Sequence, residues 1–257
     1  MNSILRSVLI LSVFIFGAAN QLSAQKNEDR IYVFDENWNG TTVEKARYLM
    51  RAKKIKDSSW QWDTYNILGP LIKTEFFKDE KGTIAEGEFY FYNAKGKLDS
   101  IHNYLDELAH GKWSYLNDTG RIYLSKEYDK GILKHTIDVI QEDSLRELEA
   151  EDDEDNDLLN IKSEFPGKAK GWLKYLEKNF KYPERALNNK ISGQVVVQFV
   201  VDTEGYVIQP RIYRSVEFSI DEEALRLIRK SPQWTPASQN GRKVKSYKRQ
   251  PVIFQFQ

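Results

Sequence analysis

The chain has 257 residues, 40% hydrophobic and 13% aromatic, and its 38 Lys and Arg residues balance 38 Asp and Glu residues. This length predicts two modest domains, the aromatic content is typical of β-sheets, and the balanced charge excludes a bulk electrostatic argument for nucleic-acid binding. The lack of cysteine excludes disulfide bonds and a lipid-modified N-terminal cysteine, so burial and hydrogen bonds must stabilise the fold.

The first 24 residues have the layout of a secretory signal peptide. Arg6 precedes an apolar run at 8–16, and small residues lead to a cleavage site between Ala24 and Gln25. The apolar run is shorter than the roughly 20 residues that span a bilayer, which favours cleavage over the alternative, an uncleaved anchor. We therefore expect a signal peptide at 1–24, a periplasmic protein, and membrane contact only if the N-terminal segment is uncleaved.

Residues 28–138 are predicted to form one domain, in which the chain from Trp60 to about Ile132 repeats a pattern of glycines and aromatic residues. The segment from Gly87 to Tyr104 aligns at equal spacing with the segment from Gly111 to Tyr128, and a slightly longer copy begins at Trp60. Each copy alternates aromatic and polar residues around a turn rich in Asn, Asp and Gly, which is typical of antiparallel hairpins. We predict an all-β antiparallel repeat domain that begins with a strand at 31–34, followed by an irregular segment.

These units resemble MORN-type repeats in the variant form common in exported bacterial proteins. In that form a Gly-x-aromatic-x-Tyr strand alternates with a turn and a second aromatic-bearing strand. We interpret Phe89, Phe91, Trp113 and Tyr115 as sheet core, and the alternative is an outward-facing platform for a ligand or a protein. No residue in the repeats implies a reaction.

Residues 139–160 form an acidic segment between the two predicted domains. Like charges at this density repel and cannot support a core, so we predict a linker that is extended or briefly helical near Leu145 and Leu148. The segment lacks the glycine and the regular spacing of a calcium-binding loop, which argues against a cation site.

The remaining residues, 161–257, predict an α+β domain with a three-stranded antiparallel sheet packed with helices. Apolar residues recur at helical spacing from Ala169 to Phe180, and Pro183 suits the first position of a short helix. A third helix is predicted to begin with a capping box at Ser219 and to end near Lys230.

The predicted strands of this domain are a hairpin and a final strand. Residues 193–201 are rich in β-branched side chains, and a turn at 202–205 leads to a second strand at 206–213. Residues 249–256 alternate like a strand that completes the sheet.

The order of these elements and several short motifs resemble the TonB C-terminal domain. The motifs are Tyr182-Pro183, Gly193-Gln194-Val195, Asp202-Thr203-Glu204-Gly205, Pro232-Gln233-Trp234-Thr235-Pro236 and Pro251-Val252-Ile253-Phe254. The resemblance covers about residues 161–257, and it departs from the family at Ala237, where many members carry glycine.

The resemblance implies recognition of an extended peptide of a TonB-dependent outer-membrane receptor, or of another envelope protein, by strand addition to the edge of the last strand. The residues expected to bind the partner are Val252, Ile253, Phe254, Gln255, Phe256, Arg249 and Tyr182. Val252, Phe254 and Phe256 are expected to face the core, so that only their backbone serves the partner. The basic residues before this strand either steer an acidic partner or discourage aggregation, and both interpretations stay open.

No catalytic, cofactor or metal site can be read from the sequence, and we predict that the protein is not an enzyme. The three histidines, His102, His110 and His135, lie in the repeat region without cysteine or regularly spaced carboxylates, so we interpret them as structural. No glycine-rich phosphate loop is present.

The function favoured by these observations is that of a periplasmic TonB-like binding protein that captures a receptor peptide. The first alternative is an inner-membrane-anchored TonB energy transducer for active transport across the outer membrane. It is less favoured because such proteins keep their N-terminal helix and usually have a proline-rich spacer. The second alternative is a structural envelope module, and formation of a homodimer is left open.

Overall fold

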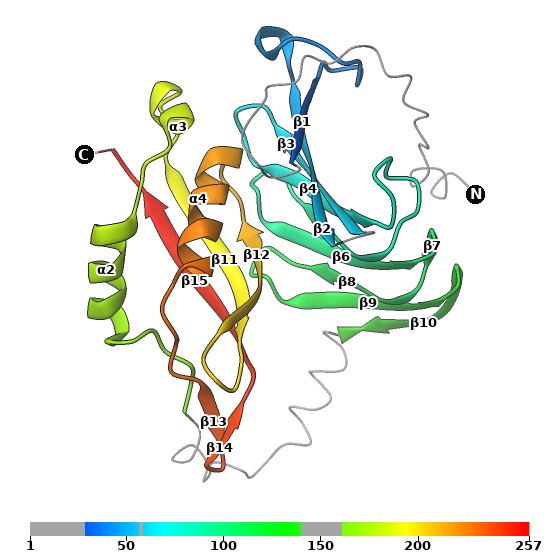
Figure 1. Ribbon diagram of the computed structural model, residues 1–257. Helices are drawn as coiled ribbons and strands as arrows, with labels where there is room; N and C mark the ends of the chain where they lie inside the picture. The colour runs from blue at the N-terminus through cyan, green and yellow to red at the C-terminus, as the bar shows by residue number, and fades with distance from the viewer. Residues whose placement is uncertain (1–28, 57–58, 140–160, 257) are drawn as a thin grey trace.

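The computed structural model describes residues 29–56, 59–139 and 161–256, in which a large antiparallel sheet lies beside a smaller α+β domain (Figure 1). The signal peptide expected at 1–24 and almost all of the acidic linker expected at 139–160 lie outside these residues. The predicted α+β domain with a three-stranded sheet and the predicted antiparallel β-domain are both present.

The first domain is a 10-stranded antiparallel sheet with the order β1-β2-β3-β4-β5-β6-β8-β9-β10, and β7 pairs with β6. Its strands are β1 (Arg30–Phe34), β2 (Tyr48–Lys56), β3 (Ser59–Asn66), β4 (Leu71–Phe77), β5 (Gly87–Tyr92), β6 (Leu98–Leu105), β7 (Leu108–Ala109), β8 (Gly111–Leu116), β9 (Ile122–Asp129) and β10 (Ile132–Asp138). The strand predicted at 31–34 is confirmed as β1. The irregular segment predicted after it is confirmed over 35–47, which contains turns and a short 3₁₀ helix, η1 (Val43–Lys45), but the prediction fails beyond it, because the regular strand β2 begins at Tyr48.

The predicted repeats are hairpins with the same register. Gly87 lies opposite Tyr104 in the β5–β6 pair, and Gly111 lies opposite Tyr128 in the β8–β9 pair. The earlier copy forms the β3–β4 hairpin, which begins at Ser59 and contains Trp60. Equal spacing in the sequence therefore produces equal hairpins stacked side by side along one sheet.

The turns of two hairpins are stabilised by an asparagine side chain. Asn93 Oδ1 accepts hydrogen bonds from the backbone N–H groups of Lys95 and Lys97 at 2.9 and 3.2 Å. Asn117 Oδ1 accepts in the same way from the N–H groups two and four residues later, both at 3.0 Å. This is how an Asn side chain replaces a backbone partner in a tight turn.

One face of the repeat sheet carries a row of aromatic side chains that pack on each other. Phe89 and Trp113 are buried, which supports their interpretation as sheet core. His102 stacks on Trp113 with ring centroids 4.0 Å apart, and burial lowers its pKa to about 4. Neither ring nitrogen of His102 has a hydrogen-bond partner among the described residues. His102 is therefore a neutral packing residue.

The second domain packs its helices on one face of a sheet with the order β12-β11-β15. Its elements are α2 (Lys168–Asn179), α3 (Glu184–Asn188), β11 (Gly193–Val201), β12 (Val207–Arg214), α4 (Phe218–Arg229) and β15 (Ser246–Phe254), with a separate small hairpin of β13 (Ala237–Gln239) and β14 (Arg242–Val244). All these elements were predicted except the β13–β14 hairpin, and β15 begins three residues earlier and ends two residues earlier than the strand predicted at 249–256.

Helix α4 begins at Phe218, two residues earlier than predicted, and its N-cap is Glu217 rather than Ser219. The buried Glu217 carboxylate accepts hydrogen bonds from the Ser219 N–H at 2.8 Å and the Ser219 hydroxyl at 2.6 Å. The capping box predicted at Ser219 is therefore wrong. A carboxylate at this position satisfies a free N–H group of the first turn and interacts favourably with the helix dipole.

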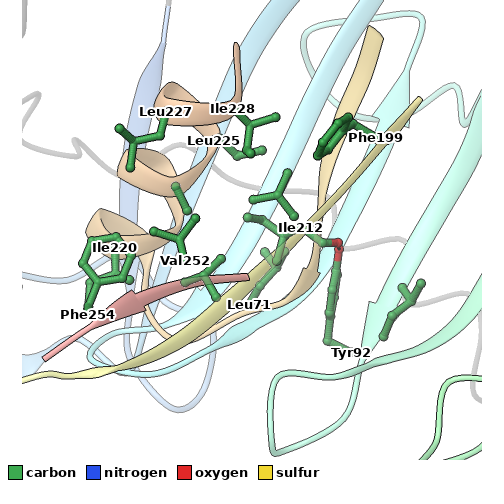
Figure 2. Packing of buried hydrophobic residues seen from close by; sticks show 14 of the residues in the cluster. Leu71, Tyr92, Phe199, Ile212, Ile220, Leu225, Leu227, Ile228, Val252 and Phe254 are labelled. Atoms are coloured by element: carbon green, nitrogen blue, oxygen red, sulfur yellow. The ribbon is translucent and has the colours of Figure 1, made fainter. Parts of the chain in front are cut away.

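The two domains share one hydrophobic cluster. Figure 2 shows side chains of α4, β11 and β15 in the same cluster as Leu71 and Tyr92 of the repeat sheet. Tyr65 of β3 is almost fully buried and meets Phe218 of α4 edge-to-face at 5.4 Å. The domains are therefore joined by side-chain packing as well as by the chain.

Two hairpin turns of the repeat sheet lie directly against the second domain. A Cβ atom on Gly96 would come within 2.4 Å of the Ser215 carbonyl oxygen, and one on Gly120 within 1.7 Å of the Tyr213 hydroxyl. Both glycines also have positive φ, 70° and 80°. The backbone conformation favours glycine at both turns, and at Gly96 the approach to the Ser215 backbone also leaves no room for a side chain.

Candidate partner-binding edge

Strand β15 pairs with β11 along its entire length without a bulge, from Ser246 opposite Val201 to Phe254 opposite Gly193. Val252 and Phe254 are fully buried on the helix-covered side of the sheet. In the described part of the chain no strand pairs with the other side of β15. Among the described strands this side of β15 is therefore an unpaired sheet edge. Pairing with β11 and the burial of alternate side chains hold the strand in position.

Tyr182 stabilises the end of this strand on the helix side. Its ring meets Phe254 edge-to-face at 5.8 Å and stacks on Phe256 at 5.3 Å, while its hydroxyl donates to the Ile191 carbonyl at 2.7 Å. Burial raises the pKa of Tyr182, which keeps the hydroxyl neutral as a donor. These contacts hold the chain beyond β15 in place.

The opposite face of β15 is exposed. Tyr247 is 76% exposed and Ile253 is 53% exposed, and Arg249 lies between them on the same face. Arg249 is directly opposite Gln198 of β11, which is opposite Arg211 of β12. A row of three polar side chains thus crosses the open face of the sheet.

Pro251 indicates which backbone groups of β15 face outward. Alternate residues of an antiparallel strand direct N–H and C=O groups to the partner strand or away from it, and proline is tolerated where its nitrogen faces away. Pro251 lies opposite Val196 in an uninterrupted register, so its nitrogen is expected to face outward. By the two-residue period, the backbone groups of Tyr247, Arg249 and Ile253 face the same free side.

The other edge of this sheet, β12, is covered by the repeat domain. The Ser215 N–H donates to the Gly96 carbonyl at 2.8 Å, and Lys97 forms a β-bridge with Arg214. The Tyr92 hydroxyl donates to the Ile212 carbonyl at 2.7 Å. The repeat domain therefore occupies the β12 edge, whereas no described strand pairs with the outer edge of β15.

Buried polar groups hold this junction together. The Ser215 hydroxyl oxygen accepts from the Leu71 N–H at 2.8 Å and lies 2.5 Å from Asp221 Oδ2, while Asp221 Oδ1 accepts from the Val216 N–H at 3.0 Å. Asp221 is fully buried, and burial raises its pKa to about 8. Through Ser215, Asp221 thus connects the start of α4 to Leu71 of the repeat sheet.

An ion-pair network continues this junction. Arg51 of β2 contacts Asp63 and Glu222 at 2.7 Å each. Arg185 of α3 contacts Glu217 at 2.6 Å and donates to the Ile67 carbonyl of the repeat domain. The charges that are removed from water at this interface therefore have partners, as a stable buried junction requires.

The seven residues predicted to bind a partner occupy three environments. Val252 and Phe254 are core, as expected, but Phe256 is 46% exposed and packs on Tyr182 because the strand ends at Phe254. Ile253 and Arg249 lie on the open face of the sheet, and Gln255 is exposed beyond the strand.

Sequence reasoning missed Tyr247, Gln198 and Arg211 on the open face. Gln198 interrupts a run of valines in β11, and that interruption was the available signal. The sequence contains no comparable signal for the contact between β12 and the hairpin turns, because that contact is made by backbone atoms, which every residue type has.

Residues 178–256 match the family model described as Gram-negative bacterial TonB protein C-terminal. The match includes α3, β11, β12, α4 and β15 and spans less than a third of the chain. The family is one of protein-interaction domains without enzymatic activity, and the match supports a TonB-like role and location in the cell envelope.

Searches of the curated proteins and of the solved structures found no match to the chain. The resemblance of the hairpins to MORN-type repeats stays a prediction.

Within residues 29–56, 59–139 and 161–256, no helix is both long enough and apolar enough to cross a membrane. The same residues contain no group of three or more His, Asp or Glu side chains arranged to hold a metal ion.

Proposed function

We propose that the protein captures an extended peptide of an outer-membrane receptor, or of another envelope protein, by strand addition to β15. The observation that supports this function best is the free edge of β15, in a domain whose other edge is covered by the repeat sheet. The match of this segment to a family of interaction domains adds to that support.

The chemistry of the edge suits a peptide strand. Main-chain hydrogen bonds to the outward groups of Tyr247, Arg249 and Ile253 would supply affinity, and the exposed side chains beside them would supply selectivity. Pro251 offers no donor, so the edge has an interrupted pattern of hydrogen-bonding groups. Such an interruption also limits unwanted pairing of identical edges.

Titration of the full chain with N-terminal peptides of outer-membrane receptors tests this function. Saturable shifts of the backbone amide signals of β15, with smaller changes in β12, are the expected result. Shifts confined to the repeat sheet, or no saturable shift with any receptor peptide, would remove strand addition as the function.

A matched pair of variants tests the backbone contact itself. Ile253→Pro removes an outward N–H group, whereas Ile253→Ala keeps it and removes only an exposed side chain. Because one main-chain hydrogen bond contributes about 1 kcal/mol, Ile253→Pro is expected to weaken peptide binding about fivefold more than Ile253→Ala. Equal affinities of two folded variants would argue against pairing at this edge.

We also propose that residues 1–24 are removed and that the mature protein is periplasmic. The layout of Arg6, the apolar run and Ala24 supports cleavage. Sequencing the N-terminus of the protein from the cell envelope is the test. A start at Gln25 is the expected result, and retention of Met1 in the inner-membrane fraction would favour the anchored energy transducer instead.

A further inference from the structure

A cleft of about 500 Å³ opens between the two domains. Its apolar wall includes Leu98, Ile101 and Leu116 of the repeat sheet, and its polar wall includes Gln198, Arg211 and Arg249 of the second domain. The volume lies in the range of roughly 300–1,000 Å³ that is typical of ligand sites. Residues of both domains therefore form the walls of this cleft.

A second hollow of about 550 Å³ shares Gln198, Arg211 and Arg249 with the first and is also lined by Tyr247. Tyr247 and Arg249 belong to β15, whereas Arg211 belongs to β12. The combined cleft thus crosses the open face of the sheet from the β15 edge toward the repeat domain.

Among the described residues, most of the positive charge in the cleft has no acidic partner. Arg249 Nε donates to Gln198 Oε1 at 3.2 Å, and its guanidinium lies 3.7 Å from the centre of the Tyr213 ring, but neither partner is a carboxylate. Arg121, which also lines the cleft, forms no ion pair with a described residue. Of these three arginines, Arg211 alone has an ion pair with a described residue, Glu88 at 3.3 Å.

Gln198 adds a donor suited to a peptide group. Its side chain is 8% exposed, and its Oε1 accepts from Arg249. Its amide NH₂ has no hydrogen-bond partner within the described part of the chain. An amide held in this way can donate to a main-chain carbonyl, because a partly buried donor gains from a new acceptor.

We propose that this cleft binds an acidic segment of a partner protein, in extended conformation, with carboxylates and apolar side chains in alternation. Successive side chains of an extended peptide point to opposite sides. Carboxylates would therefore face Arg249 and Arg121, while the alternate apolar side chains would face Leu98, Ile101 and Leu116. This site gives the repeat domain a direct part in recognition, and it does not require strand addition to β15.

The test uses the full chain and a terminally blocked decapeptide of alternating aspartate and leucine, with a copy that carries asparagine in place of aspartate. Binding is measured by fluorescence anisotropy in 50 mM and 500 mM salt. We expect the aspartate peptide to bind more tightly than the asparagine peptide and to weaken at the higher salt concentration, as screening of the ion pairs requires.

Three variants locate the bound peptide. Arg249→Gln is expected to weaken binding about tenfold, because a hydrogen bond to a charged group is lost. Arg242→Gln on β14 removes the same charge from an exposed position outside the cleft and is expected to leave the affinity unchanged. Ile253→Pro, which targets the β15 edge, is also expected to leave it unchanged.

Several results would overturn the proposal. Equal binding of the two peptides would show that carboxylates are not recognised, and equal losses in Arg249→Gln and Arg242→Gln would indicate diffuse attraction. Loss of binding in folded Ile253→Pro would place the peptide on the β15 edge and would leave the proposed strand addition intact. Binding of anionic phospholipid vesicles without binding of the peptide would assign the arginines to a membrane surface.

Discussion

Replacement of Asp221 by Asn is expected to change how stability depends on pH. The ordinary pKa of the carboxyl is 3.8, and burial raises it to about 8 in the folded protein. Between these values the unfolded chain has lost the proton while the folded chain keeps it. The folded state therefore binds more protons, and the free energy of unfolding falls as pH rises through this window.

For one proton, the free energy of unfolding changes by about 1.4 kcal/mol per pH unit. Between pH 5 and pH 7 this carboxyl is therefore expected to lower the free energy of unfolding by about 2.7 kcal/mol. Asp221→Asn resembles the protonated carboxyl, because its NH₂ group can donate to the Ser215 hydroxyl and its oxygen can accept from the Val216 N–H. The Asn side chain at position 221 does not titrate, so the contribution of this position to the pH dependence of the unfolding free energy is expected to vanish.

Urea unfolding at pH 5, 6 and 7, followed by fluorescence of the buried Trp172 and Trp234, measures the effect. The difference in unfolding free energy, variant minus wild type, is expected to grow with pH. Asp118→Asn, at an exposed turn position, serves as the control and is expected to run parallel to the wild type. Parallel profiles of Asp221→Asn and wild type would refute the idea that Asp221 is protonated in the folded protein.

Two further predictions concern packing. Gly96→Ala is expected to destabilise the protein by about 1–3 kcal/mol more than Gly241→Ala. Both glycines have positive φ, but of the two only Gly96 lies against another backbone segment, at Ser215. Similar midpoints of the two variants in chemical unfolding would contradict this close approach. Phe254→Ala is expected to cost about 3–5 kcal/mol, whereas the exposed Ile253→Ala is expected to stay within about 0.5 kcal/mol. Comparable losses in thermal unfolding would mean that β15 does not alternate between core and solvent as described.

The hairpins and the elements of the second domain could be predicted because their signals are local. Alternating side chains, the turns at Asn93 and Asn117, and the helical spacing before Phe180 act within a few residues of the chain. Strand β2 was missed because Arg51 interrupts its apolar pattern, and this arginine is buried only through its ion pairs with Asp63 and Glu222. Asp63 lies opposite Arg51 in the neighbouring strand β3, and Glu222 belongs to the other domain, so the pattern within β2 itself does not reveal either partner.

The candidate site could be predicted only in part for the same reason. The alternation in the final strand correctly placed Val252 and Phe254 in the core, but the end of the strand decides that Phe256 is exposed. The cleft depends on how the second domain meets the repeat sheet. That contact uses Gly96, whose role in a turn is evident from the sequence but whose neighbour Ser215 is not.

The backbone contact at the hairpin turns has a consequence for sequence variation among relatives. The Gly96 carbonyl accepts from Ser215, while Ala94 and Lys95 of the same turn point to solvent. Substitutions at such exposed turn positions should accumulate freely, whereas Asn93 and Gly96 should be retained. Two relatives could therefore keep the same arrangement of domains while differing at most side chains on the surface of these turns.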